Sequence, residues 1–204
     1  NASHDLHVVA TAAGRSAEAM KYARRAFEHY GQGNPRVPNL AHDVAYFWMT
    51  EGAFERALAV FQACLPTLSE PAERIATLSN VARAAGGVRD RDVFQEAWMQ
   101  VWTAFDKGTG PFISAEALLE LAHGAVSLGD WDRAELAAQR AHDIARERRE
   151  GRIQLAAESL LDAVHGYRAA KATVQLAPAP ENDAEADAFA EELVHSLNEY
   201  AVAS

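Results

Sequence analysis

The sequence predicts an all-α protein of about ten helices, and three observations support that fold class. Apolar residues recur at helical spacing along almost the whole chain, and no stretch alternates apolar and polar residues between hairpin turns. Hydrophobic residues make up 49% of the 204 residues, which is enough for a sizeable core. Alanine is abundant, whereas β-branched and aromatic residues are sparse, and this balance favours helix over sheet.

Clusters of proline, glycine, asparagine and aspartate separate the expected helices from one another. The stretch GQGNPRVPN separates the second helix from the third, and AGGVRDRD separates the fifth from the sixth. Ser69, with Pro71 just inside, is a typical helix start, as is Ser114 before the seventh helix. The expected helices span residues 4–13, 16–31, 38–51, 54–66, 70–85, 91–106, 114–128, 131–149, 152–174 and 183–202.

A skeleton of glycine, an aromatic residue and small residues recurs along the chain and predicts repeated helix pairs. It reads Gly129, Trp131, Ala134, Ala138 and Ala141 in one pair, and Gly52, Phe54, Ala57, Phe61 and Cys64 in another. Small residues let two antiparallel helices approach closely, and we expect this role for Ala45, Ala57, Ala122 and Ala134. We expect Trp131 to fill the gap between its own pair and the next. Such pairs stack into a solenoid.

On these turn-glycine, aromatic and alanine positions, residues 3 to 149 resemble the tetratricopeptide repeat (TPR) family, in a divergent, bacterial type of array. The spacing of about 37 to 40 residues exceeds the 34 of that family. The resemblance implies a right-handed α-α superhelix over residues 3–175. Residues 176–182 are expected to be a linker, and residues 183–204 a helix that caps the array or supports a homodimer.

No motif in the sequence carries catalytic chemistry. The chain lacks a phosphate-binding glycine loop, an HExxH or CxxC motif and a nucleophile elbow. His4 and His7 have metal-ligand spacing, but partly exposed helix positions are the preferred interpretation. Cys64, at a small-residue packing position, is expected to be a buried, unreactive thiol. We therefore expect no enzyme activity, no cofactor and no metal.

Charge and hydropathy narrow the choice of partner. The net charge of −10 provides no dense basic face, so no direct contact with nucleic acid is expected. No apolar run approaches the length of a membrane span, so we expect no membrane partner and a cytoplasmic location.

In TPR arrays, the first helix of each pair lines the concave face. Transferred by register, that face carries side chains that can contact or hydrogen-bond a peptide. The sequence therefore predicts a non-catalytic protein- or peptide-binding scaffold, and the alternative is a ligand-sensing regulatory domain of a larger transcriptional regulator or signalling protein. The candidate binding residues are Asn39, His42, Tyr46, Met49, Asn80, Arg83, Glu116, His123 and Ser127.

Overall fold

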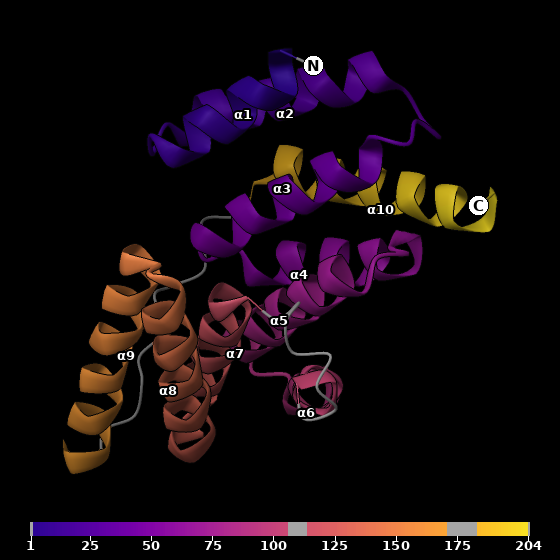
Figure 1. Ribbon diagram of the computed structural model, residues 1–204. Coiled ribbons are helices and arrows are strands. Elements are labelled where there is room, and N and C mark those ends of the chain that lie inside the picture. Colours follow the sequence, from indigo (N-terminus) through magenta and orange to yellow (C-terminus); the bar gives the residue numbers. More distant parts are fainter. Residues whose placement is uncertain (1, 106–113, 171–182, 204) are drawn as a thin grey trace. The chain divides into compact units, whose positions relative to one another are not determined.

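The computed structural model describes residues 2–105, 114–170 and 183–203, and this part of the chain is built from α-helices (Figure 1). It contains ten α-helices, one short 3₁₀ helix and no strand, which confirms the all-α class. None of the described helices combines the length and the apolar character needed to cross a membrane. The helices are α1 Ala2–Ala12, α2 Ser16–Tyr30, α3 Val37–Thr50, α4 Phe54–Cys64, η1 Leu65–Thr67, α5 Pro71–Val88, α6 Arg91–Ala104, α7 Ala115–Leu128, α8 Trp131–Arg148, α9 Gly151–Ala170 and α10 Ala184–Ala203.

The chain divides into two compact units. Unit 1 comprises Asn1–Leu68 together with Ala179–Ser204, and unit 2 comprises Ser69–Pro178. Unit 1 therefore contains α1 to α4, η1 and α10, whereas unit 2 contains α5 to α9. This division differs from the expected one, which placed residues 3–175 in one repeat domain and residues 183–204 outside it. The expected linker, residues 176–182, lies outside the described residues.

In unit 1, two helix pairs pack through small side chains. The helix α1 packs on α2, α3 packs on α4, and α2 contacts α3. Alanines at helical spacing on α2 are fully buried, as are Ala45 of α3 and Ala57 of α4. Gly52 allows the tight turn between α3 and α4 because its φ of 82° lies in the left-handed region. The small residues expected at these helix crossings are thus buried as predicted.

The last helix, α10, completes the core of unit 1. It packs on α3, α4 and η1, and its apolar stripe is buried. Phe189 has no exposed surface and meets Phe27 and Trp48 edge to face, with ring centroids 5.7 and 6.1 Å apart. Ala188, on the same helix, is exposed. The chain's final described helix is therefore part of the unit formed by its first residues.

In unit 2, α5 and α7 approach each other backbone to backbone. A Cβ added to Gly86 would lie 2.4 Å from the carbonyl oxygen of Gly124, and one added to Gly124 would lie 2.5 Å from that of Ala82. The break predicted at Gly86 is wrong, because α5 continues to Val88. The helix ends at Arg89, which has a left-handed conformation, and Asp90 then caps α6.

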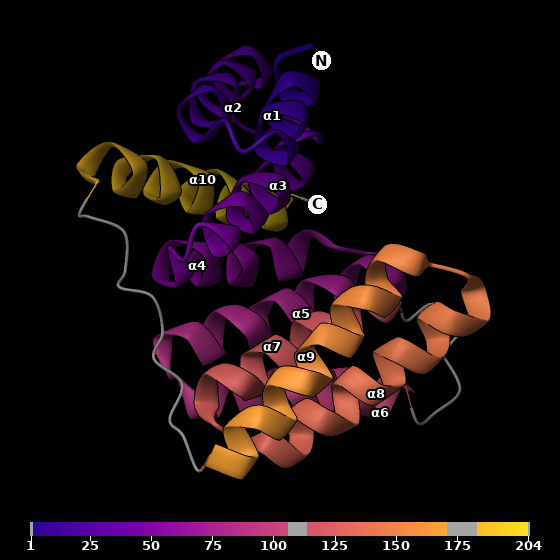
Figure 2. The same cartoon turned by 90° about the vertical axis from the view of Figure 1, so that its left-hand side faces the viewer.

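The remaining helices of unit 2 continue the stack. The helix α7 packs on α8, and α8 packs on α9, as Figures 1 and 2 both show. Trp131, at the start of α8, stacks on Tyr167 of α9 with ring centroids 5.5 Å apart and planes 11° apart. Its position between one helix pair and the following helix agrees with the prediction, but its side chain is only half-buried.

Candidate functional site

Four of the predicted binding residues lie on α3 in unit 1, and one of them was assigned wrongly. Met49 is 1% exposed, so it is part of the core and is not available to a partner. Asn39 is exposed, whereas His42 and Tyr46 are half-buried. The His42 ring packs edge to face on Phe61 with centroids 5.3 Å apart. Met49 therefore does not lie on the solvent-facing side of α3, whereas Asn39 does.

The other five predicted residues lie on the neighbouring helices α5 and α7 of unit 2. Arg83 is half-buried, whereas Asn80 is only 5% exposed and belongs largely to the interior. Glu116, His123 and Ser127 are half-buried on α7. The close contact at Gly86 and Gly124 holds these two helices together. The structure therefore brings the predicted residues of unit 2 into one region, which we name the α5–α7 face.

A buried carboxylate that the sequence analysis missed lies at the centre of this face. Glu120 is 5% exposed and forms an ion pair with Arg83. A charged group that loses water is stabilised by an opposite charge at hydrogen-bond distance, and leaving either partner alone there is costly. The signal in the sequence was a single glutamate between Leu119 and Leu121, where an apolar residue is usual.

His123 lies one helical turn after Glu120 and is held neutral. Burial, and secondly the positive charge of Arg83, lower the pKa of His123 from 6.5 to about 4. A neutral imidazole has one donor nitrogen and one acceptor nitrogen. Among the described residues, no hydrogen-bond partner faces the His123 ring. The ring thus has both hydrogen-bonding functions available in a half-buried position.

Two further polar groups lie on the same helix as His123. Glu116 accepts a hydrogen bond from Arg152 of α9 over 3.0 Å, so polar pairs extend across three helices. The Ser127 hydroxyl donates to the His123 carbonyl oxygen over 3.1 Å, within its own helix. Ser127 therefore satisfies a helix carbonyl and is a weaker candidate for ligand contact than the sequence analysis expected.

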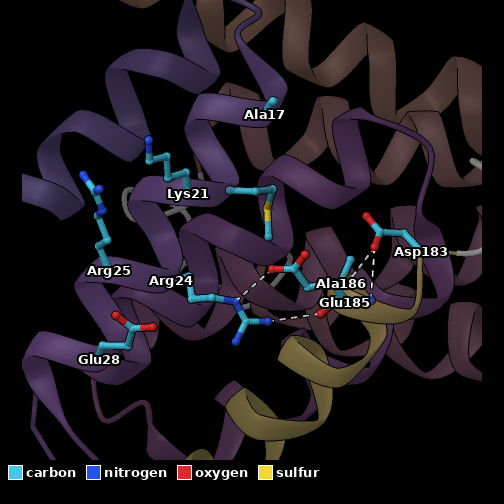
Figure 3. A pocket seen from close by; sticks show the side chains of 9 residues that line it. Ala17, Lys21, Arg24, Arg25, Glu28, Asp183, Glu185 and Ala186 are labelled. Carbon is cyan, nitrogen blue, oxygen red and sulfur yellow. Dashed lines mark hydrogen bonds and ion pairs between the residues drawn. The ribbon is translucent and has the colours of Figure 1, made fainter.

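Unit 1 contains a cleft of about 470 Å³ between α2 and the start of α10 (Figure 3). One wall carries Lys21, Arg24 and Arg25, and the other carries Asp183 and Glu185. The Arg24 side chain forms ion pairs of 3.6 Å with both Glu185 and Glu192. Its guanidinium carbon also lies 4.6 Å from the centre of the Phe189 ring. These contacts hold α10 against α2, and the carboxylates of α10 offset the positive charge of Arg24.

The histidines near the chain start have structural partners. His4 bonds Asp43 through Nε2 over 2.8 Å and the Tyr30 hydroxyl through Nδ1 over 3.2 Å. The buried His7 donates from Nδ1 to the Ala19 carbonyl oxygen over 2.9 Å. Burial acts to raise the pKa of Asp43, but hydrogen bonds from His4 and His42 outweigh it and hold that pKa well below 3.8. No group of three or more metal-binding side chains converges within the described residues.

Comparison of the chain with protein-family models, with curated proteins and with solved structures finds no match.

Proposed function

We propose that the chain is a non-catalytic, TPR-like helical-repeat module, of the right-handed superhelical type, that binds a protein or peptide through the α5–α7 face. The observation that carries this proposal is the neutral, half-buried imidazole of His123, whose nitrogens have no hydrogen-bond partner among the described residues. Arg83 beside it adds a positive charge that is only partly enclosed.

These groups suit the backbone of an extended peptide. Each peptide unit offers one N–H and one carbonyl oxygen, and a neutral imidazole can accept from the first and donate to the second. Arg83 adds a preference for a carbonyl oxygen or a carboxylate. Because Arg83 is already paired with Glu120, the ligand would share that guanidinium, and we expect a modest, reversible affinity.

The test is a selection from a displayed library of random 12-residue peptides, followed by affinity measurements on synthetic binders. We expect His123→Leu, which keeps the volume but removes both hydrogen-bonding functions, to weaken at least one class of binder about tenfold. The matched control is His165→Leu in the same unit, because the side chain of His165 is 56% exposed. A library in which no binder depends on His123 would overturn the proposal.

The pH dependence provides a second criterion. Because the pKa of His123 is lowered to about 4, the ring stays neutral from pH 8 down to about 5. We expect the affinity of His123-dependent peptides to be constant over that range and to fall only as the pH approaches 4. A midpoint near 6.5 would show that an ordinary, solvated histidine is responsible.

The alternative, a ligand-sensing regulatory domain, is favoured by the division into two units. The chain passes between unit 1 and unit 2 twice, near Leu68 and near Pro178, so a ligand bound in one unit has two covalent routes to the other. Hydrogen exchange measured with a selected peptide tests this role. Altered protection in unit 1 on binding to unit 2 would support it, and protection confined to unit 2 would oppose it.

A further inference from the structure

A row of aromatic side chains follows one side of α6. Phe94, Trp98, Trp102 and Phe105 succeed each other at helical spacing. The rings of Trp98 and Trp102 stack with centroids 5.2 Å apart and planes 9° apart. The Trp102 and Phe105 rings follow at 5.5 Å. The row begins in the core at Phe94, which is 1% exposed, and ends at half-buried rings.

Two arginines of α8 lie against this row. The guanidinium carbon of Arg133 is 5.3 Å from the centre of the Trp98 ring, and that of Arg140 is 5.8 Å from the Phe105 ring. Leu136 lies between Arg133 and Arg140 along α8 and on the same side of that helix, so we infer that it borders the aromatic row. The aromatic row of α6 therefore faces α8, and the side chains of both helices form one surface.

Apolar side chains are exposed along this surface. Met99 of α6 is 52% exposed and Leu136 of α8 is 45% exposed, while Trp102 and Phe105 are half-buried. Isolated exposed apolar residues are normal, but a contiguous group with aromatic rings is characteristic of binding sites. We name this group the α6–α8 surface, and it consists of Met99, Trp102, Phe105, Leu136 and Arg140.

The charges beside these residues indicate the chemistry of the partner. Arg133 has a carboxylate neighbour, since its Nη1 lies 3.5 Å from Asp130. The exposed Arg140 has no carboxylate partner among the described residues, and its guanidinium contacts the Phe105 ring. A cation beside an apolar surface is complementary to a ligand that combines an apolar side chain with a carboxylate.

We propose that the α6–α8 surface binds an acidic peptide segment of a partner protein. An apolar side chain of the peptide packs among Met99, Trp102 and Leu136, and an aspartate or glutamate pairs with Arg140. A nucleic acid is the less suitable occupant, because phosphate chains require several cations in a row, and among the described residues this surface offers one arginine without a carboxylate partner. The site uses α6 and α8, so it is independent of the proposed α5–α7 face.

The experiment selects displayed 12-residue peptides on the wild-type chain while removing those that also bind Leu136→Glu. We expect the surviving peptides to be enriched in Asp or Glu together with Leu, Phe or Trp. A synthetic survivor should lose affinity about tenfold or more with Leu136→Glu and with Arg140→Glu. Arg140→Lys should recover part of that loss, because it restores the charge without the planar fork.

Two control variants test whether a loss of peptide affinity is specific to the α6–α8 surface. Leu155→Glu makes the same change at another leucine of unit 2, which is 68% exposed on α9, and should leave the affinity unchanged. His123→Leu should also leave it unchanged, so failure of the α5–α7 proposal would not affect the result. The proposal is overturned if no peptide survives, if survivors bind Arg140→Glu as well as wild type, or if a 12-nucleotide deoxythymidine strand binds more tightly with the same dependence on Arg140.

Discussion

Units 1 and 2 stack their helices by similar means but close their cores in opposite ways. Unit 1 includes α10, which lies far along the chain from its other helices. Large aromatic rings fill its core, where Phe189 packs against both Phe27 and Trp48. Unit 2 is continuous in sequence, and its α5–α7 contact depends on the absence of side chains at Gly86 and Gly124. Unit 1 is therefore sensitive to lost volume, and unit 2 is sensitive to added volume.

The largest effect is expected from Gly124→Val in unit 2. Even a Cβ at this position would lie 2.5 Å from the Ala82 carbonyl oxygen, so α5 and α7 must separate. We expect a loss of more than about 4 kcal/mol, measured by urea unfolding and by hydrogen exchange in α5 and α7. Gly166→Ala in α9 is the control, because a Cβ added at Gly166 would meet no atom outside its own helix backbone within 4 Å. This variant should stabilise the fold by up to about 1 kcal/mol. Equal losses from the two variants would contradict the close contact.

The complementary change in unit 1 is Phe189→Ala, which leaves a cavity among aromatic rings. We expect a loss of about 3–5 kcal/mol. The single cysteine reports it, because burial raises the pKa of Cys64 to about 12 and native alkylation should be slow. Alkylation should accelerate in Phe189→Ala and remain slow in Val202→Ala, whose side chain lies on the same helix and is 90% exposed.

The same assay tests the homodimer that the sequence analysis considered. If α10 came from a second chain, dilution would release it and speed up Cys64 alkylation. We expect an alkylation rate that does not depend on protein concentration, as α10 packing within its own chain requires.

A smaller effect is expected from Trp131→Ala, between α8 and α9. Because the ring is half-buried, the loss should be about 2 kcal/mol, less than for a fully buried tryptophan. A double-mutant cycle with Tyr167→Ala should give a coupling of about 1 kcal/mol, since the two rings stack at 5.5 Å. Purely additive losses would show that the stacking contributes no stability.

The smallest effect is a difference in pH dependence between the units. The folded-state pKa of His123 is about 4, below the ordinary 6.5, so its contribution to unit 2 is complete above pH 6.5 and is lost as pH falls toward 4. Because the ring reaches solvent, we expect this loss to be about 1–2 kcal/mol. Asp43 acts in the same direction, but its contribution to unit 1 persists down to about pH 4 and is lost below it.

Hydrogen exchange at pH 7 and at pH 5, used to monitor the unfolding of each unit, measures this difference. The His123→Leu variant should abolish the part of the slope that belongs to unit 2. An unchanged slope in that variant would assign the effect to other groups.

The sequence predicted the local features well because helix periodicity and capping depend on neighbouring residues. Ser114 caps α7 by accepting from the Ala117 N–H, as expected, and Pro71 lies in the first turn of α5, although the N-cap residue there is Glu70 and not Ser69. Gly86 was misread as a break, because a glycine needed for helix contact has the same local signature as one that ends a helix. The burial of Met49 and Glu120 was also missed, since it depends on which helices lie beside them.

The packing partners of α10 could not be predicted from local sequence either, because they depend on residues far away in the chain. Its docking depends on pairs such as Arg24 and Glu185, which are 161 residues apart in the chain. The sequence predicted a helix over residues 183–204 that caps the array or supports a homodimer, but the pattern of one helix does not identify the helices that cover it.

The position of α10 in the chain has a consequence for synthesis on the ribosome. Multidomain proteins usually fold from the N-terminus onward as the chain emerges. Here unit 2 is one continuous stretch, whereas unit 1 needs a helix that is translated after the whole of unit 2. The helices α1 to α4 are translated before unit 2, so the apolar side chains that α10 covers must stay exposed until α10 has been made. A chaperone that shields nascent chains would have its longest task at α2, α3 and α4.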